Sequence, residues 1–125
     1  MLASRLAATA ALALFSVAPA PAAAPAAVVV QVYSYGFAPR PIYLRAGQPV
    51  TLTFVNQSGS SHDFTAPGFF QHARITAGAA REDEIELRPH ETRTITLIPA
   101  RGTYQAHCSH FFHKQLGMSD TIIVN

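Results

Sequence analysis

The sequence predicts an all-β fold, an antiparallel β-sandwich of about seven or eight short strands. From residue 28 onward, short segments alternate apolar and polar residues, which is the pattern of strands buried on one face. Gly, Pro and Asn separate these segments, as expected for tight turns. The pattern extends over about 100 residues, which suits one small domain with a single core.

The first strands are separated by turn-forming residues. Residues 28–33 and 42–44 are rich in β-branched and aromatic residues. Pro39 and Pro41 lie between them and suit a strand edge, because proline cannot donate a ladder hydrogen bond. In residues 50–55 the apolar side chains alternate with threonine, so this segment is expected to be a half-buried strand.

The second half of the chain continues the β pattern. A further extended piece is expected to open at His62, after a polar loop. Alternating or β-rich segments predict four more strands, over residues 84–87, 92–97, 103–108 and 121–124. Between residues 68 and 83 the regular alternation of apolar and polar residues is lost. One short helix over residues 77–84 is expected there, although Gly78 weakens it.

The first 26 residues are expected to be a signal peptide with a short Ala- and Pro-rich lead. Met1 to Arg5 carries one positive charge, residues 6–18 are mainly apolar, and small residues follow. This apolar run is shorter than the roughly 20 residues that span a bilayer, and the small residues fit a cleavage site. We therefore expect a periplasmic or secreted location without stable membrane insertion, with a retained anchor as the weaker alternative. Residues 27–125 then form the domain.

The charge of the chain argues against a nucleic acid as partner. The formal net charge is +2, and removal of Arg5 with the signal peptide leaves a near balance without any block of like charge. Proteins that bind nucleic acids carry a clustered basic face. We therefore expect no nucleic-acid binding.

Cys108 is the only cysteine, so no disulfide can form within the chain, although export implies an oxidising compartment. Taken alone, this thiol could be a buried core residue, a catalytic nucleophile or a metal ligand. Its neighbours favour the metal ligand. Cys108, His113 and Met118 follow one another with the spacing C-x4-H-x4-M, and His62 lies far upstream.

These four residue types suit copper. Two His and one Cys with a weak axial Met define a mononuclear blue-copper electron-transfer centre. The thiolate of Cys108 supplies a soft bond that accommodates both oxidation states, and the two imidazoles suit either state. The sequence therefore predicts one type 1 copper ion per chain, with a ligand set that consists of His62, Cys108, His113 and Met118.

The same segments closely resemble the cupredoxin family of small blue copper proteins. Gly102-Thr-Tyr-Gln-Ala-His-Cys-Ser109, then His113 and Leu116-Gly-Met118, resembles that family's C-terminal ligand loop. Residues 46–56 with His62-Asp-Phe64 resemble its N-terminal ligand region. The resemblance extends over residues 28–125, although 68–91 is generic. It implies a Greek-key sandwich and the same four copper ligands.

Three further polar residues lie beside the expected ligands. Asp63 is expected to accept hydrogen bonds from the Cys108 loop and so to join the two halves of the site. His107 is expected to be an exposed strand histidine, because Tyr104, Ala106 and Cys108 alternate with it toward the core; a second copper at His107 is the alternative. His110 is expected at the rim of the site, with a role as a competing donor as the alternative.

The expected function is one-electron transfer. We expect His113 at the solvent edge, within an apolar surface that supports weak and transient contacts with redox partner proteins. That surface is expected to comprise Phe111, Phe112, Leu116 and Pro67-Gly68. The protein is expected to be a monomer and not an enzyme. Storage, delivery or resistance to copper is the alternative function, and a nitrite-reductase-like enzyme or a Cys/His hydrolase is a more distant one.

Overall fold

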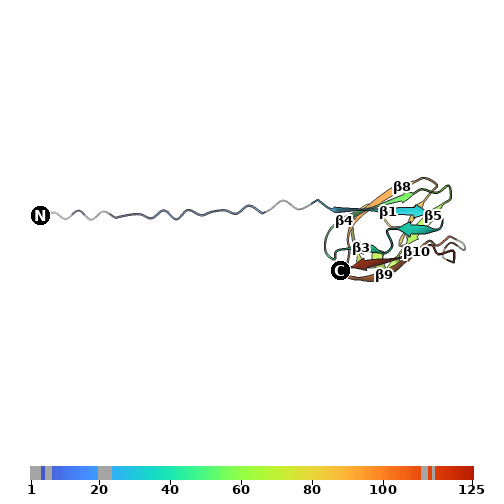
Figure 1. Ribbon diagram of the computed structural model, residues 1–125. Coiled ribbons are helices and arrows are strands. Elements are labelled where there is room, and N and C mark those ends of the chain that lie inside the picture. The colour runs from blue at the N-terminus through green and yellow to red at the C-terminus, as the bar shows by residue number, and fades with distance from the viewer. Residues whose placement is uncertain (1–3, 5–6, 20–23, 111–112, 114) are drawn as a thin grey trace.

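The computed structural model describes residues 4, 7–19, 24–110, 113 and 115–125. Residues 7–19 form an exposed tail without regular structure, which Figure 1 shows extending away from the folded part. None of the described helices is long and apolar enough to cross a membrane. The predicted signal peptide and its boundary at residue 26 therefore stay predictions.

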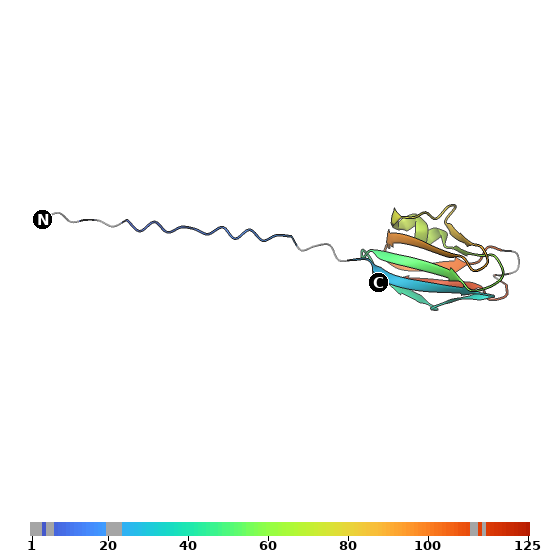
Figure 2. The ribbon, with the colours of Figure 1, turned by 90° about the horizontal axis from the view of Figure 1, so that it is seen from above.

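Two five-stranded sheets form the folded part, and Figure 2 shows them as two layers. The first sheet has the order β2 (Gly36–Ala38), β1 (Ala26–Tyr33), β4 (Val50–Asn56), β8 (Thr92–Ile98) and β6 (Arg74–Ala77). The second has the order β3 (Ile42–Leu44), β10 (Ser119–Val124), β9 (Gly102–His107), β5 (His62–Thr65) and β7 (Glu84–Leu87). The predicted all-β sandwich is confirmed.

The number of strands and two of their pairings differ from the prediction. The described residues contain ten strands, because β2 and β6 were not expected. β1 pairs with β4 in parallel, and so does β10 with β3. A parallel pair needs a long crossover connection, and residues 34–49, which contain β2 and β3, provide one between β1 and β4.

The predicted helix over residues 77–84 is wrong. Gly78 adopts φ +80°, and a Cβ there would lie 2.9 Å from the carbonyl oxygen of Thr94. Glu82 and Asp83 also have positive φ, which a right-handed helix excludes. The described part of the chain has its helix earlier, at α1 (Pro67–His72), where proline suits the first turn because no partner for its nitrogen is needed there.

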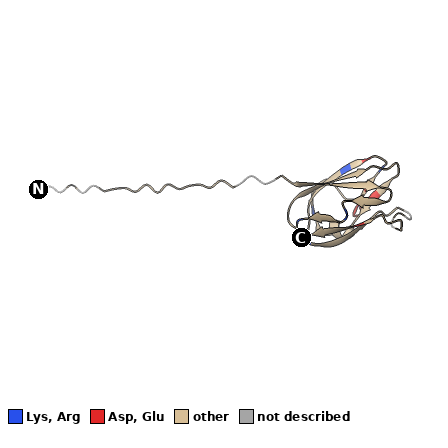
Figure 3. Ribbon diagram, viewed as in Figure 1, with Lys and Arg blue, Asp and Glu red and all other residues tan. Residues whose placement is uncertain are grey.

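Aromatic side chains fill the space between the sheets. Phe64 on β5 contacts Phe37 and Phe54 of the first sheet, with ring centroids 5.2 and 4.8 Å apart respectively. All three rings are buried. Side chains two residues apart on a strand face the same side of the sheet, so His62 at the start of β5 shares the inward face of Phe64. Acidic and basic positions are scattered over the ribbon of the described residues (Figure 3).

Candidate metal centre

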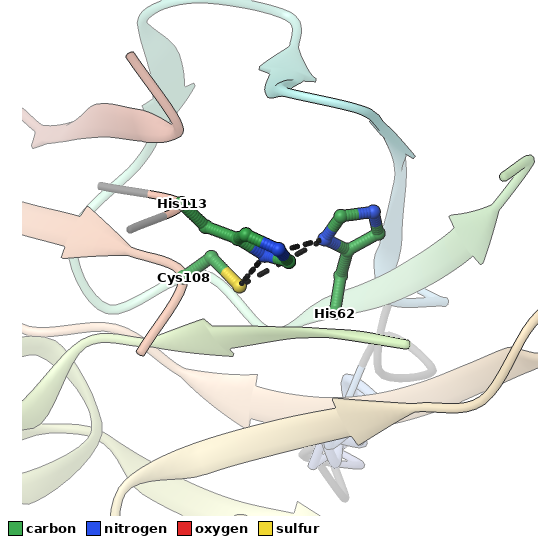
Figure 4. A group of neighbouring side chains, drawn as sticks. All are labelled: His62, Cys108 and His113. Atoms are coloured by element: carbon green, nitrogen blue, oxygen red, sulfur yellow. Dashed lines mark hydrogen bonds between the residues drawn. The ribbon is translucent and has the colours of Figure 1, made fainter. Parts of the chain in front are cut away.

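Three elements bring His62, Cys108 and His113 together at one end of the sandwich. His62 opens β5, Cys108 directly follows β9, and His113 lies in the loop between β9 and β10. Figure 4 shows their side chains pointing toward one another. His62 and Cys108 are buried, whereas His113 is half-buried. The group therefore has two donors fixed in the core and one donor near solvent.

The three donor atoms are arranged around a common centre. The Sγ of Cys108 lies 3.3 Å from Nδ1 of His113 and 3.9 Å from Nδ1 of His62, and the two nitrogens are 3.1 Å apart. A point equidistant from all three atoms is about 2.0 Å from each, close to the roughly 2.0–2.3 Å bonds that imidazole and thiolate form with transition-metal ions such as zinc. A trigonal His₂Cys set of this kind suits copper.

Met118 lies next to two of these residues along the backbone. Its side chain is fully buried, with an exposed fraction of 0%. The Cys108 amide donates to the Met118 carbonyl at 3.1 Å, and the Met118 amide donates to the His113 carbonyl at 3.0 Å. Gly117 adopts φ +89°, a conformation that glycine adopts readily, so the loop turns just before Met118. The axial role of the thioether stays a prediction.

Ser34 fixes the orientation of the His62 ring. Its Oγ lies 2.9 Å from Nε2 of His62. A metal bound at Nδ1 requires the ring proton on Nε2, which would then donate to Ser34. Such contacts hold ligand rings in place and strengthen metal binding. Ser34 could not be predicted from the sequence, because a serine in the turn after β1 belongs to no motif.

Asp63 joins β5 to the segment after Cys108, as the sequence predicted. Its carboxylate accepts from the Ser109 amide at 2.8 Å, from the Ser109 hydroxyl, and from the Thr65 hydroxyl at 2.7 Å. The Asp63 amide also donates to the Sγ of Cys108 at 3.5 Å. Asp63 is only 1% exposed, so its carboxylate is buried, although Ser109, which donates to it, lies at the surface.

Burial disfavours the charged forms of both inner donors. It is the main cause that lowers the pKa of His62, with the positive fields of His113 and His110 adding to the effect. Burial also raises the pKa of the Cys108 thiol, although amide hydrogen bonds oppose it. Neutral imidazole is the metal-binding form. A bound cation would reverse the effect at Cys108, because a coordinating thiol loses its proton.

Tyr35 covers the site on the solvent side. Its ring centroid lies 5.0 Å from that of His113 and 6.2 Å from that of His62, and the residue is 44% exposed. Leu116 is 57% exposed, and its amide donates to the His113 carbonyl at 3.1 Å. Tyr35 was missed because it lies far from the ligand loop in sequence.

Gly68, which was also expected beside His113, lies elsewhere. Gly68 packs against the Tyr104 ring rather than near His113, since a Cβ on it would lie 3.3 Å from that ring. Tyr104 lies on β9, four residues before Cys108, which corresponds to roughly 13 Å of extended chain. Phe111 and Phe112 lie outside the described residues.

The two flanking histidines have different surroundings. His107 is half-buried rather than exposed, and lies in register with Thr65 on the outward face of the sheet. Within the described residues it belongs to no donor cluster. His110 lies at the rim, where its Nε2 is 3.1 Å from Oε1 of Glu86 and 3.6 Å from Oδ2 of Asp63.

Comparisons with known proteins agree with the fold. A family model described as a cupredoxin-like domain matches residues 6–124. Among solved structures, the chain is 24% identical to auracyanin B, with a TM-score of 0.59 over 83% of this chain and 92% of that one. Reduced auracyanin from Roseiflexus castenholzii is 21% identical, with a TM-score of 0.61 over 82% and 99% of the two chains.

A third similar structure is auracyanin A from Chloroflexus aurantiacus, which is described as a blue copper protein. It is 21% identical, with a TM-score of 0.60 over 82% of this chain and 100% of that one. A comparison with curated proteins finds no match. At these identities the solved structures support the fold.

Proposed function

The chain belongs to the cupredoxin family, and from this premise we propose that it is a type 1 copper protein that carries single electrons. The bound copper would supply the redox chemistry by alternating between Cu(II) and Cu(I). The observation that carries the proposal is the arrangement of the His62, Cys108 and His113 donor atoms at about 2.0 Å from one point. Met118 is proposed as the weak axial ligand.

The residues around the donors favour rapid electron transfer because they restrict movement. Ser34 holds the His62 ring through Nε2, and Asp63 holds Ser109, directly after Cys108. Phe64 anchors β5 in the core. Ligands that are held in this way change position little when the charge at the centre changes, so little reorganisation opposes each transfer.

The exposed part of the site suits short encounters. Tyr35 and Leu116 present apolar surface next to His113, and small apolar patches are typical of transient redox complexes. We infer that partner proteins exchange electrons through this face while the protein remains a monomer. A periplasmic or secreted location fits this function, and no catalytic activity is proposed.

Copper delivery is the second candidate, and one observation favours it. Asp63, Cys108 and His110 form another donor cluster that shares the Cys108 sulfur. Rates of electron self-exchange separate the two functions. Rapid exchange supports the carrier, whereas slow exchange with ready transfer of copper to an acceptor supports delivery.

Replacement of the thiolate tests the proposed centre. In Cys108→Ser we expect the loss of the intense visible absorption of the Cu(II) form, because that band requires a sulfur-to-copper bond. The control is His107→Gln, which leaves all proposed ligands intact and should keep the band. A Cys108→Ser variant that retained the band would contradict the assignment.

A further inference from the structure

A second set of donors surrounds the Cys108 sulfur. Donor atoms of Asp63, Cys108 and His110 all lie within 4.8 Å of one another. The set contains one sulfur, one nitrogen and one oxygen, whereas the first set contains two imidazoles and the same sulfur. One side chain therefore belongs to two possible coordination sites.

The carboxylate of Asp63 keeps a binding position directed at His110. Oδ1 accepts from the Ser109 amide and from the Thr65 hydroxyl. Oδ2 accepts from the Ser109 hydroxyl and lies 3.6 Å from Nε2 of His110. Since each carboxylate oxygen offers about two acceptor positions, Oδ2 retains one. Asp63 itself is buried, with only 1% of its surface exposed.

Solvent reaches this set from the His110 side. The side chain of His110 is 32% exposed and that of Glu86 is 45% exposed. Both oxygens of Glu86 lie near Nε2 of His110, at 3.1 and 3.4 Å. A cation that approaches from solvent would therefore meet an imidazole and a carboxylate before it meets the buried Cys108. The negative charge of Glu86 would attract it.

The two sets are close enough for exchange. The rings of His110 and His113 are stacked, with centroids 5.5 Å apart and an angle of 12° between their planes. The ring of His62 lies 6.5 Å from that of His110. A metal ion bound to Cys108 could thus change its nitrogen ligands by a short movement past one sulfur atom.

We propose that Asp63, Cys108 and His110 form a loading site, which receives copper from solvent and passes it to His62 and His113. This inference rests on the proposed copper function. The bond to Cys108 Sγ persists during the transfer. Bonds to the Asp63 oxygen and the His110 nitrogen break while bonds to Nδ1 of His62 and of His113 form. The copper keeps its oxidation state, and the thiol proton leaves to solvent when the sulfur first binds.

The direction of transfer follows from ligand type. Carboxylate oxygen is a harder donor than imidazole nitrogen, and copper prefers the softer set of two imidazoles and a thiolate. Because the bond to the shared sulfur is kept throughout the transfer, the same ion moves from one set to the other. Copper binding therefore stays at one ion per chain.

Rates of copper uptake test the loading site in the full-length protein. Cu(II) is mixed with the metal-free protein, and the growth of the thiolate-to-copper absorption is followed by stopped flow. His110→Gln should weaken the first capture of the ion about tenfold, the lower end of the loss of affinity that residues around a metal cause when they are replaced. Uptake should slow accordingly, while the final spectrum and stoichiometry are unchanged. His107→Gln is the matched control and should load at the wild-type rate.

An equilibrium measurement isolates the second set. In the variant His62→Ala/His113→Ala, the loading site alone remains, and we expect it to bind one Co(II) with a thiolate-to-cobalt band. Addition of His110→Gln should weaken that binding at least about tenfold. Far-UV circular dichroism checks that both variants are folded; if the double variant is unfolded, the uptake rates decide alone.

The outcomes separate the inference from the proposed function. If wild-type protein never develops a thiolate-to-copper band, both fail. If it does, but His110→Gln loads at the wild-type rate, the loading site is refuted and the electron-carrier proposal stands. Slow loading by His110→Gln with an unchanged final spectrum supports the loading site.

Discussion

The two donors that come from the sandwich differ from the donor that comes from the loop. His62 and Cys108 are fully buried, and β5 and β9 hold them against the core. His113 is half-buried, and its backbone forms hydrogen bonds with His110, Leu116 and Met118. One proposed site can therefore combine a rigid interior with a replaceable donor that faces solvent. We expect the buried pair to set the geometry of the proposed centre and His113 to provide access to it.

Replacement of each histidine by glycine should reveal this difference most strongly. In His113→Gly we expect added imidazole to enter the vacated position and restore the copper spectrum, because that position faces solvent. In His62→Gly imidazole should fail to restore it, because the position is enclosed by the core. Optical titration with imidazole measures both. Equal rescue of the two variants would show that the sites are equally accessible and would contradict the comparison.

The hydrogen bonds between Asp63 on β5 and Ser109 in the Cys108 loop should affect copper affinity. Asp63→Ala removes the acceptor for Ser109, so β5 loses the side-chain bonds that hold the Cys108 loop. We expect copper affinity to fall about 10–100-fold, measured by competition with a chelator of known affinity.

Asp63→Asn is the matched control for this loss. It keeps one oxygen acceptor and should retain most of the affinity. It also removes a negative charge near the metal, so we expect a higher midpoint potential in protein-film voltammetry. Unchanged affinity in the alanine variant would show that the loop is held by other contacts.

A smaller effect, on the pH dependence of stability, is expected at Asp120, a buried acid on β10. Its exposed fraction is 2%, and within the described residues its Oδ2 has no hydrogen-bond partner. Burial raises its pKa from 3.8 to about 6, although the Thr121 amide and Arg40 oppose the shift. Because the folded state binds this proton more tightly, the free energy of unfolding falls as pH rises from about 4 to 6.

Asp120→Asn should therefore stabilise the metal-free protein by about 1–3 kcal/mol above pH 6, and the gain should vanish below about pH 4. Urea denaturation at several pH values measures it. Glu82→Gln, which changes an exposed acid, is the control and should have little effect. A gain that is independent of pH would show that charge at Asp120 is not the cause.

The regular part of the fold could be predicted because its signal is local. Alternation located β4, β7 and β8 to within one residue at each end. β6 was missed because its polar–apolar alternation extends over only four residues, all of which are exposed. The parallel pairing of β1 with β4 was missed because alternation reveals a strand but not the direction of its partner.

The residues of the site also divide into those with a local sequence signal and those that only the fold brings together. The donors that lie close together in sequence, Cys108 and His113, could be found from their spacing, and His62 from its place after a strand. Ser34 and Tyr35 contact the same rings, yet only the folded chain brings their turn to the site. The roles of the four predicted ligands, including the axial Met118, remain predictions that metal binding must test.

Loading the purified protein with Cu(II) tests the central claim most directly. The proposed centre predicts one copper per chain, an intense thiolate-to-copper band in the visible spectrum, and a paramagnetic-resonance signal with the small copper hyperfine splitting of a type 1 site. Weak visible absorption with a large hyperfine splitting, as for copper bound by nitrogen and oxygen alone, would contradict it.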